Sequence, residues 1–157
     1  MKTALIVILV LLLAPVVIFF MLGFSSKSGE APGLVDGHLA NCPDKPNCVS
    51  SENISDVTHY IKPITIAKNM TFEPLPLLKN TINDMGGIIQ KENDNYISAT
   101  FSSAIFGFVD DLEIRIDTSE QLIHLRSASR VGRSDAGVNK ERIELFKRLY
   151  NNQTSLQ

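Results

Sequence analysis

The chain has 157 residues, of which 44% are hydrophobic and only two are cysteines, and its formal net charge is -2. This length provides for one domain rather than two. The near-neutral charge argues against non-specific binding to nucleic acid, because such binding needs a strong excess of basic side chains.

A long apolar segment lies at the N-terminal end. Ala4–Phe24 has no charged or hydrogen-bonding side chain, and as a helix it is about 31 Å long, enough to cross a bilayer core. The alternative is a cleaved signal peptide. The apolar core of such a peptide has ~7–15 residues and precedes a small-residue cleavage site, which Phe24–Ser28 does not offer. We therefore predict an uncleaved transmembrane anchor over residues 1–24.

The charges that flank this segment indicate its orientation. Lys2 and the N-terminal amine lie on one side, and Lys27 and Glu30 lie on the other. Positive charge favours the cytoplasmic side, so the N-terminus is expected inside and the rest of the chain outside. The predicted location is the cell (inner) membrane, single-pass, with the C-terminal domain in the periplasm or another extracytoplasmic space.

Residues 25–41 contain glycines, serines and Pro32 with little apolar periodicity, which predicts a flexible tether. The two cysteines, Cys42 and Cys48, then enclose a proline-rich loop. Outside the cytoplasm such a pair most often forms a disulfide, with free thiols and a metal site as the alternatives. The two thiols with His38 fall short of a closed four-ligand site. We predict neither a metal nor a cofactor.

The remaining pattern predicts an α+β domain over residues 42–152, followed by a short tail at 153–157. Apolar residues at helical spacing indicate a helix near 75–85, which the glycines at 86 and 87 end, and a second helix at 139–150. Adjacent β segments imply a small antiparallel sheet with both helices on one face, in the order β-α-β-β-β-β-α. The expected strands are 59–66, 88–92, 96–103, 108–117 and 121–131.

The apolar residues of the last two strands predict how these strands pair with each other. With a turn centred on Thr118 and Ser119, Asp117 faces Glu120. One face of the hairpin is then uniformly apolar, as a sheet with one buried face requires. The apolar residues of this face are Leu112, Ile114, Ile116, Ile123 and Leu125.

The opposite face of this hairpin is charged. In the same register Asp111 lies opposite Arg126, Glu113 lies opposite His124, and Arg130 has no carboxylate partner. Cross-strand ion pairs of this kind stabilise a sheet by ~0.2–1 kcal/mol, which is a purely structural interpretation. Two arginines at alternating positions also form a donor surface that suits a carboxylate or a phosphate. We therefore predict Arg130 as the residue that faces a ligand.

A polar, glycine-containing loop connects this strand to the last helix. Asp135 or Asn139 is suited to cap that helix, and the helix N-terminus beside the arginines is suited to hold an anion. The predicted ligand-binding residues are Arg126, Arg130, Asp135, Asn139, Asp111 and Arg142.

Several short motifs together resemble the domain-of-unknown-function 1499 family. They are Cys42-Pro43, Pro46-Asn47-Cys48-Val49-Ser50-Ser51, Phe108-Val109-Asp110-Asp111, Arg126–Gly132, Ser134-Asp135, Gly137-Val138-Asn139 and Arg142-Ile143. The resemblance covers about residues 40–150. It implies a small extracytoplasmic or organellar domain, often membrane-anchored, and it supplies no activity to transfer. Arg133 and Ala136 depart from the aromatic and the larger apolar residue that the resemblance leads us to expect.

Three functions are consistent with the sequence. The first is a non-catalytic module that binds an anionic small molecule, a lipid headgroup or a protein partner. The second is a structural or assembly subunit of a membrane complex. The third is a hydrolase with Asp110, Asp111, Glu113 and His124 in acid–base roles. The chain has no serine or cysteine nucleophile signature, so the balance favours a protein that is not an enzyme.

Overall fold

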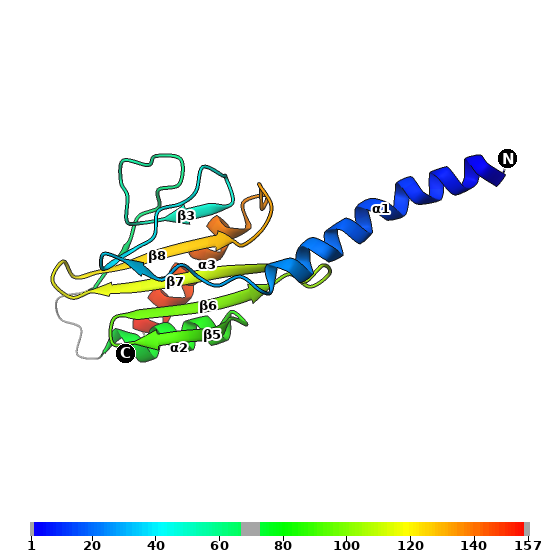
Figure 1. Cartoon of the computed structure of the whole chain (residues 1–157). Coiled ribbons are helices and arrows are strands. Elements are labelled where there is room, and N and C mark those ends of the chain that lie inside the picture. The colour runs from blue at the N-terminus through cyan, green and yellow to red at the C-terminus, as the bar shows by residue number, and fades with distance from the viewer. Residues whose placement is uncertain (1, 67–72, 156–157) are drawn as a thin grey trace.

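The computed structural model describes residues 2–66 and 73–155. A long helix leads into an antiparallel sheet that has two shorter helices behind it (Figure 1). The helices are α1 (Lys2–Ser26), α2 (Pro74–Asp84) and α3 (Val138–Thr154). The strands are β1 (Leu34–Val35), β2 (His38–Leu39), β3 (Cys48–Ser50), β4 (Ile64–Thr65), β5 (Ile88–Asn93), β6 (Tyr96–Ser102), β7 (Val109–Asp117) and β8 (Leu122–Ser129).

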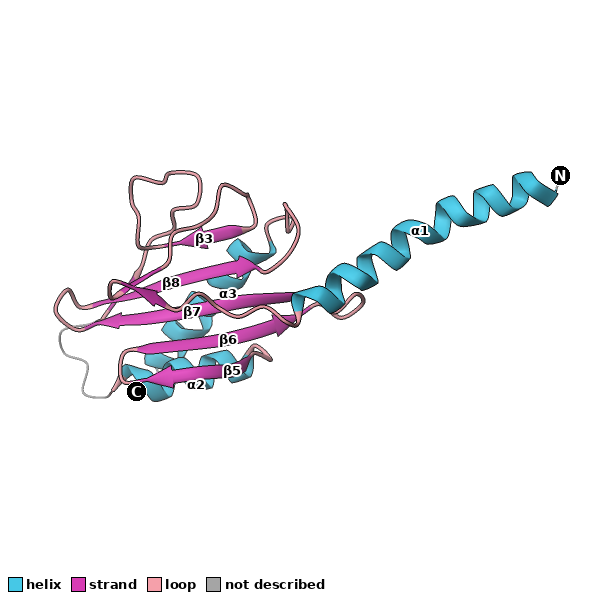
Figure 2. Cartoon of the chain, in the orientation of Figure 1, coloured by secondary structure: helices cyan, strands magenta, loops and turns pink. Residues whose placement is uncertain are grey.

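The main sheet has the order β3-β8-β7-β6-β5, and β4 also pairs with β8. Every strand pair in it is antiparallel. The helices α2 and α3 lie together on one face of this sheet (Figure 2). The predicted α+β class, with an antiparallel sheet, two helices on one face and an N-terminal apolar helix, is confirmed.

The hydrophobic core lies between the sheet and these two helices. Side chains alternate between the two faces of a strand, so the apolar residues at every second position of β7 and β8 all point to the helices. Leu112 and Leu125 are fully buried there against Ile82 of α2 and Phe146 of α3. The apolar side of the β7–β8 hairpin therefore faces the hydrophobic core, as the sequence predicts.

Both predicted domain helices are present, within a few residues of their expected ends. Pro74 fits the first turn of α2, where the missing N–H has no helical partner. Gly86 follows α2 with a φ of +78°, a left-handed conformation that glycine adopts without strain. The helix α3 extends past the predicted range of 139–150 at both ends.

Two of the predicted strand assignments need correction. The expected strand 59–66 is reduced to β4 and a single parallel bridge between Tyr60 and Ser50. No strand is predicted at 48–50, at the end of the disulfide loop, whereas Cys48–Ser50 form the edge strand β3. A three-residue strand is too short to show an alternating pattern, so pairing with β8 determines it rather than local sequence.

The predicted β7–β8 register is wrong by two residues. Asp117 pairs with Leu122 rather than Glu120, and Glu113 pairs with Arg126 rather than His124. The turn is longer because the Asp117 carboxylate accepts hydrogen bonds from the Ser119 hydroxyl and from two backbone N–H groups. A shift of two residues leaves every side chain on its predicted face, since the side-chain period of a strand is two.

Residues 27–41, most of the segment expected to be a flexible tether, run across the polar face of the sheet (Figure 1). The backbone N–H of Gly33 donates to Glu113 of β7 at 2.9 Å, and that of Leu39 donates to Glu52 at 3.1 Å. The strands β1 and β2 form a small hairpin here. The sheet is thus covered on both faces, by helices on one and by this N-terminal segment on the other.

The helix α1 is long and apolar enough to cross a membrane. Its C-terminal end contacts the β6–β7 loop, where Phe19 and Phe20 lie against Phe106 with ring centroids 5.2 and 5.1 Å apart. Gly23 lies so close to the Phe106 carbonyl that an added Cβ would be 1.9 Å from its oxygen. The helix end is therefore docked on the domain.

Candidate functional site

Two ion pairs lie on the polar face of the sheet, beneath the N-terminal segment. Glu113 pairs with Arg126 at 2.7 Å, and Asp111 pairs with Arg130 at 2.7 Å. All four side chains are buried or nearly so, with Glu113 completely inaccessible to solvent. We call these four residues the outer polar cluster. Its negative and positive charges are equal in number.

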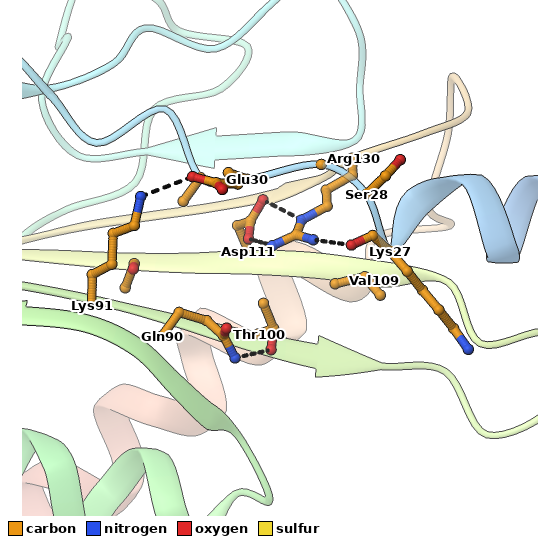
Figure 3. A pocket seen from close by; sticks show the side chains of 12 residues that line it. Lys27, Ser28, Glu30, Gln90, Lys91, Thr100, Val109, Asp111 and Arg130 are labelled. Atoms are coloured by element: carbon orange, nitrogen blue, oxygen red, sulfur yellow. Dashed lines mark hydrogen bonds and ion pairs between the residues drawn. The ribbon is translucent and has the colours of Figure 1, made fainter.

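Arg130 is held from two directions (Figure 3). Its guanidinium donates twice to the Asp111 carboxylate, at 2.9 and 2.7 Å, and a third nitrogen lies 3.3 Å from the carbonyl oxygen of Ser26. The predicted register left Arg130 without a carboxylate, but the observed one supplies it. These contacts tie the end of α1 to the sheet, so Arg130 has a structural role whether or not it also contacts a ligand.

Glu113 is the centre of a buried hydrogen-bond network. Besides Arg126, it accepts from the Tyr96 hydroxyl at 2.8 Å and from the Gly33 N–H. Burial, followed by the negative charge of Glu113, raises the pKa of the Tyr96 phenol, which therefore stays a protonated donor. The Nε atom of Arg126 is buried and has no hydrogen-bond partner among the residues that the structure describes.

A second ionic network, centred on Glu52, lies toward the β7–β8 turn. Arg115 donates to Glu52 at 2.7 and 3.2 Å, and His124 Nδ1 lies 3.7 Å from the same carboxylate. Burial alone would raise the pKa of Glu52, but hydrogen bonds from Arg115 and from the backbone of Leu39 outweigh it and hold the pKa below its usual value. Sequence reasoning missed Glu52; its place directly after the Cys48–Ser51 motif was the available signal.

A third polar group lies on the other face, between the sheet and the start of α3. Arg142 donates to Asp110 at 2.7 Å and to Ser127 at 3.0 Å, and Asn139 also contacts Ser127. The Arg142 guanidinium also lies 4.9 Å from the centroid of the Phe101 ring. We call Asp110, Ser127, Asn139 and Arg142 the inner polar cluster.

Asp135 lies just before this cluster. It accepts the backbone N–H groups of Gly137 and Asn139, so it caps the N-terminus of α3.

The six predicted ligand residues are thus divided between two faces of the sheet. Arg126, Arg130 and Asp111 belong to the outer cluster. Asn139 and Arg142 belong to the inner one, and Asp135 lies next to it at the start of α3. Odd and even strand positions point to opposite faces, so Asp110 and Asp111 cannot serve one site. Binding of a ligand by these residues stays a prediction.

The three carboxylates considered for acid–base chemistry are engaged with arginines, whereas the fourth candidate, His124, contacts Ser51 and Glu52. Asp110, Asp111 and Glu113 each accept a hydrogen bond from a guanidinium. Each of these carboxylates thus already has a guanidinium as its hydrogen-bond partner within the fold. These pairs favour a structural use of the three carboxylates.

Asp117, Glu120 and His124 are grouped closely enough to be considered as metal ligands. Their ligand atoms lie within 4.8 Å of one another. Arg115 donates to Asp117 at 2.9 Å, however, and its positive charge opposes a cation at the same carboxylate. We assign no metal to this group.

The disulfide loop borders the inner cluster. The sulfur atoms of Cys42 and Cys48 are at bonding distance, 2.02 Å. Cys48 is buried and pairs with Ala128 of β8. Asn47, in the same loop, accepts from Asn139 through its backbone carbonyl at 3.0 Å. The loop therefore fixes the edge of the sheet beside the start of α3.

Three cavities of similar size lie around these clusters. The first, about 340 Å³, lies between the N-terminal segment and the sheet and is bordered by Arg130, Glu30 and Lys91 (Figure 3). The second, about 330 Å³, adjoins the disulfide loop and the start of α3. The third, about 340 Å³, lies between α1, the β6–β7 loop and the loop that follows β8. We call the third the α1-side cavity.

Arg133 borders both the second cavity and the α1-side cavity. It is exposed and has no ion-pair partner among residues 2–66 and 73–155. In this it differs from Arg115, Arg126, Arg130 and Arg142, whose guanidiniums all contact carboxylates. Among the arginines on and directly after β8, Arg133 therefore has a charge that is available to a ligand.

The fold defines a small α+β domain, attached to a helix that is able to span a membrane. A family model described as "Protein of unknown function (DUF1499)" matches residues 38–149. The chain belongs to this family, as its motifs predict. No curated protein matches the chain.

Proposed function

We propose that this protein is a single-pass membrane protein whose extracytoplasmic domain is a non-catalytic module that binds an anionic ligand at the membrane surface. The observation that carries the proposal is the place of Arg133. Arg133 has no ion-pair partner among the described residues, and it lines the α1-side cavity together with Phe19 and Leu22 of α1. Arginine is well suited to carboxylates and phosphates because its planar fork donates two parallel hydrogen bonds.

The contact between α1 and the domain supports an uncleaved anchor. Phe19 and Phe20 contact Phe106, and the ring centroids of Phe19 and Phe108 are 6.2 Å apart. Removal of α1 would expose these loop aromatics to water. A signal peptide is discarded and needs no such fitted contact with the mature domain.

Two features support the extracytoplasmic side. A disulfide between Cys42 and Cys48 persists in an oxidising compartment and is rare in the cytosol. Lys2, at the far end of α1 from the domain, favours the cytoplasmic side for that end.

The partners of the carboxylates support binding over catalysis. Asp110, Asp111 and Glu113, the acidic residues considered for hydrolysis, each form an ion pair with an arginine. A cavity of about 340 Å³ lies within the ~300–1,000 Å³ range of small-molecule sites.

The test is native purification of the full chain from membranes, followed by mass spectrometry of whatever is bound. Wild-type protein, R133Q and the control R148Q are compared. Arg148 is exposed on α3, further from the α1-side cavity, and its substitution changes the net charge equally. We expect an anionic small molecule or lipid that wild type and R148Q retain and R133Q loses. A stoichiometric protein partner would favour an assembly subunit instead, and the absence of any bound anion would contradict the proposal.

A further inference from the structure

The α1-side cavity has one wall made by the membrane-spanning helix and one made by the domain. Phe19 and Leu22 of α1 line it together with Phe108, Val131 and Val138 of the domain. Phe19 lies about 8 Å along the helix from Phe24, where the apolar segment ends. In a bilayer, this wall would extend from the headgroup level to the depth of the first acyl carbons, the depth that interfacial apolar side chains reach.

The polar lining of the cavity leaves one charge available. Asp110 and Asp135 also border it, but Asp110 pairs with Arg142 and Asp135 accepts the N–H groups that begin α3. Arg133 has no ion-pair partner among the described residues. The cavity therefore presents apolar walls and one unpaired guanidinium at the same place.

We infer that the α1-side cavity binds an anionic phospholipid of the membrane that α1 spans, with its phosphate at Arg133 and an acyl chain against Phe19, Leu22 and Phe108. This inference rests on the proposed function and names its ligand. A soluble anion would not use the apolar wall that α1 provides. A phospholipid has both parts, and it reaches the cavity by lateral diffusion, since α1 carries the wall into the bilayer.

The neighbouring loop supports this placement. Ile105, at the tip of the β6–β7 loop, is 74% exposed although it is fully apolar. It lies on the same loop as Phe106, which contacts the end of α1. An exposed isoleucine beside a membrane helix is suited to the apolar boundary of the bilayer. Lys27, the first charged residue after α1, provides a second cation at that level.

The test is photocrosslinking of the full chain in phosphatidylcholine nanodiscs. The probes are phosphatidylglycerol and phosphatidylcholine that carry the same diazirine-labelled acyl chain, each added as a minor component. We expect the phosphatidylglycerol probe to label the peptides with Phe108, Val131 or Val138 about fivefold more than the phosphatidylcholine probe, the ratio that corresponds to ~1 kcal/mol. R133Q should remove this preference without reducing labelling of α1, R148Q should preserve it, and R133K should give an intermediate value.

Three outcomes would overturn the inference. Equal labelling of the domain by both probes would show contact with bulk lipid only. Unchanged preference in R133Q would remove Arg133 from the site. Displacement of the phosphatidylglycerol probe by excess inorganic phosphate, or a soluble anion in the native purification without any domain labelling, would indicate a site for a free anion. In that last case the proposed function stands and only the lipid assignment fails.

Discussion

Glu113 shows how a single buried charge can organise a face of a sheet. It accepts hydrogen bonds from a side chain of β6, a side chain of β8 and the backbone of the N-terminal segment. A buried ion pair contributes little net stability relative to a well-packed apolar pair. Loss of one member is costly, however, because the other charge is left without compensation.

We expect E113Q to destabilise the domain by about 3–5 kcal/mol, because the buried Arg126 loses the carboxylate with which it pairs. Urea unfolding followed by circular dichroism measures this loss. The matched control is E30Q, which removes the exposed pair between Glu30 and Lys91 and should leave the unfolding midpoint unchanged. Equal midpoints for E113Q and wild type would show that Glu113 does not hold this face together.

At the residue scale, the sequence predicts the sheet face on which a side chain lies better than it predicts the ion-pair partner of that side chain. Arg126 and Asp111 were assigned to the correct face, because alternation along a strand depends only on the parity of the position. They were predicted to pair with each other, but Arg126 pairs with Glu113 and Asp111 pairs with Arg130, because partners depend on the length of the β7–β8 turn. Glu52 could not be predicted as the partner of Arg115, since 63 residues separate them and no local pattern links them.

At the element scale, the β7–β8 turn illustrates how one side chain determines a register. The Asp117 carboxylate accepts hydrogen bonds from the Ser119 hydroxyl, the Glu120 N–H and the Arg115 guanidinium, and these lower the pKa of Asp117 well below its usual range. A two-residue turn centred on Thr118 and Ser119 would not allow all these bonds. Gln121 closes the longer turn with a φ of +56°.

We expect D117A to destabilise the domain by about 1–2 kcal/mol at neutral pH, through loss of the hydrogen bonds that close the turn. Since the folded pKa of Asp117 lies below its unfolded value, its contribution is complete above about pH 4. The contribution then decreases as the pH falls toward the folded pKa. Urea unfolding at pH 7 and pH 3 should therefore show a smaller difference between D117A and wild type at pH 3. The control is E120A, and a difference that grows at low pH would contradict this account.

The docking of α1 is also an element-scale property, and Gly23 makes it possible. A Cβ at this position would collide with the Phe106 carbonyl, and a shift of the helix would break the hydrogen bond from the Val109 N–H to the Ser26 hydroxyl at 3.0 Å. The sequence alone does not reveal this contact. Apolar residues that face lipid and apolar residues that face a protein loop look alike in a hydrophobic segment.

We expect G23V to undock α1 and to raise hydrogen exchange at the Val109 amide about tenfold, equivalent to ~1.4 kcal/mol of lost local protection. The measurement is hydrogen exchange of the full chain in nanodiscs, read by mass spectrometry. A14V, the matched enlargement at an exposed position far from the domain, should exchange as wild type does. Unchanged protection in G23V would show that the helix end is not held by this contact.

At the scale of the whole molecule, the strands from 88 onward and the two domain helices follow from periodicity and turn residues, and the structure confirms them. The placement of residues 27–41 and of β3 does not follow, because long-range hydrogen bonds to Glu113, Glu52 and β8 fix them. The four paired arginines are explained by the fold. The sequence alone does not distinguish Arg133 from these arginines, because its lack of an ion-pair partner among the described residues follows only from the three-dimensional structure.

We propose that α1 is a membrane anchor that holds the domain against the membrane surface. The docked end of α1, the β6–β7 loop and the start of α3 lie at one end of the molecule, and the β7–β8 turn lies at the other (Figure 1). The α1-side cavity is therefore at the membrane end. The proposed arrangement requires that the domain lies outside the cytoplasm and that α1 is retained.

The most direct test is treatment of intact spheroplasts with a protease, with fragments detected by mass spectrometry and by an antibody against α3. We predict that the domain is digested while a fragment containing α1 remains in the membrane. Lysed spheroplasts provide the control for protease activity. Full protection of the domain, or its recovery as a soluble chain that lacks α1, would contradict the account.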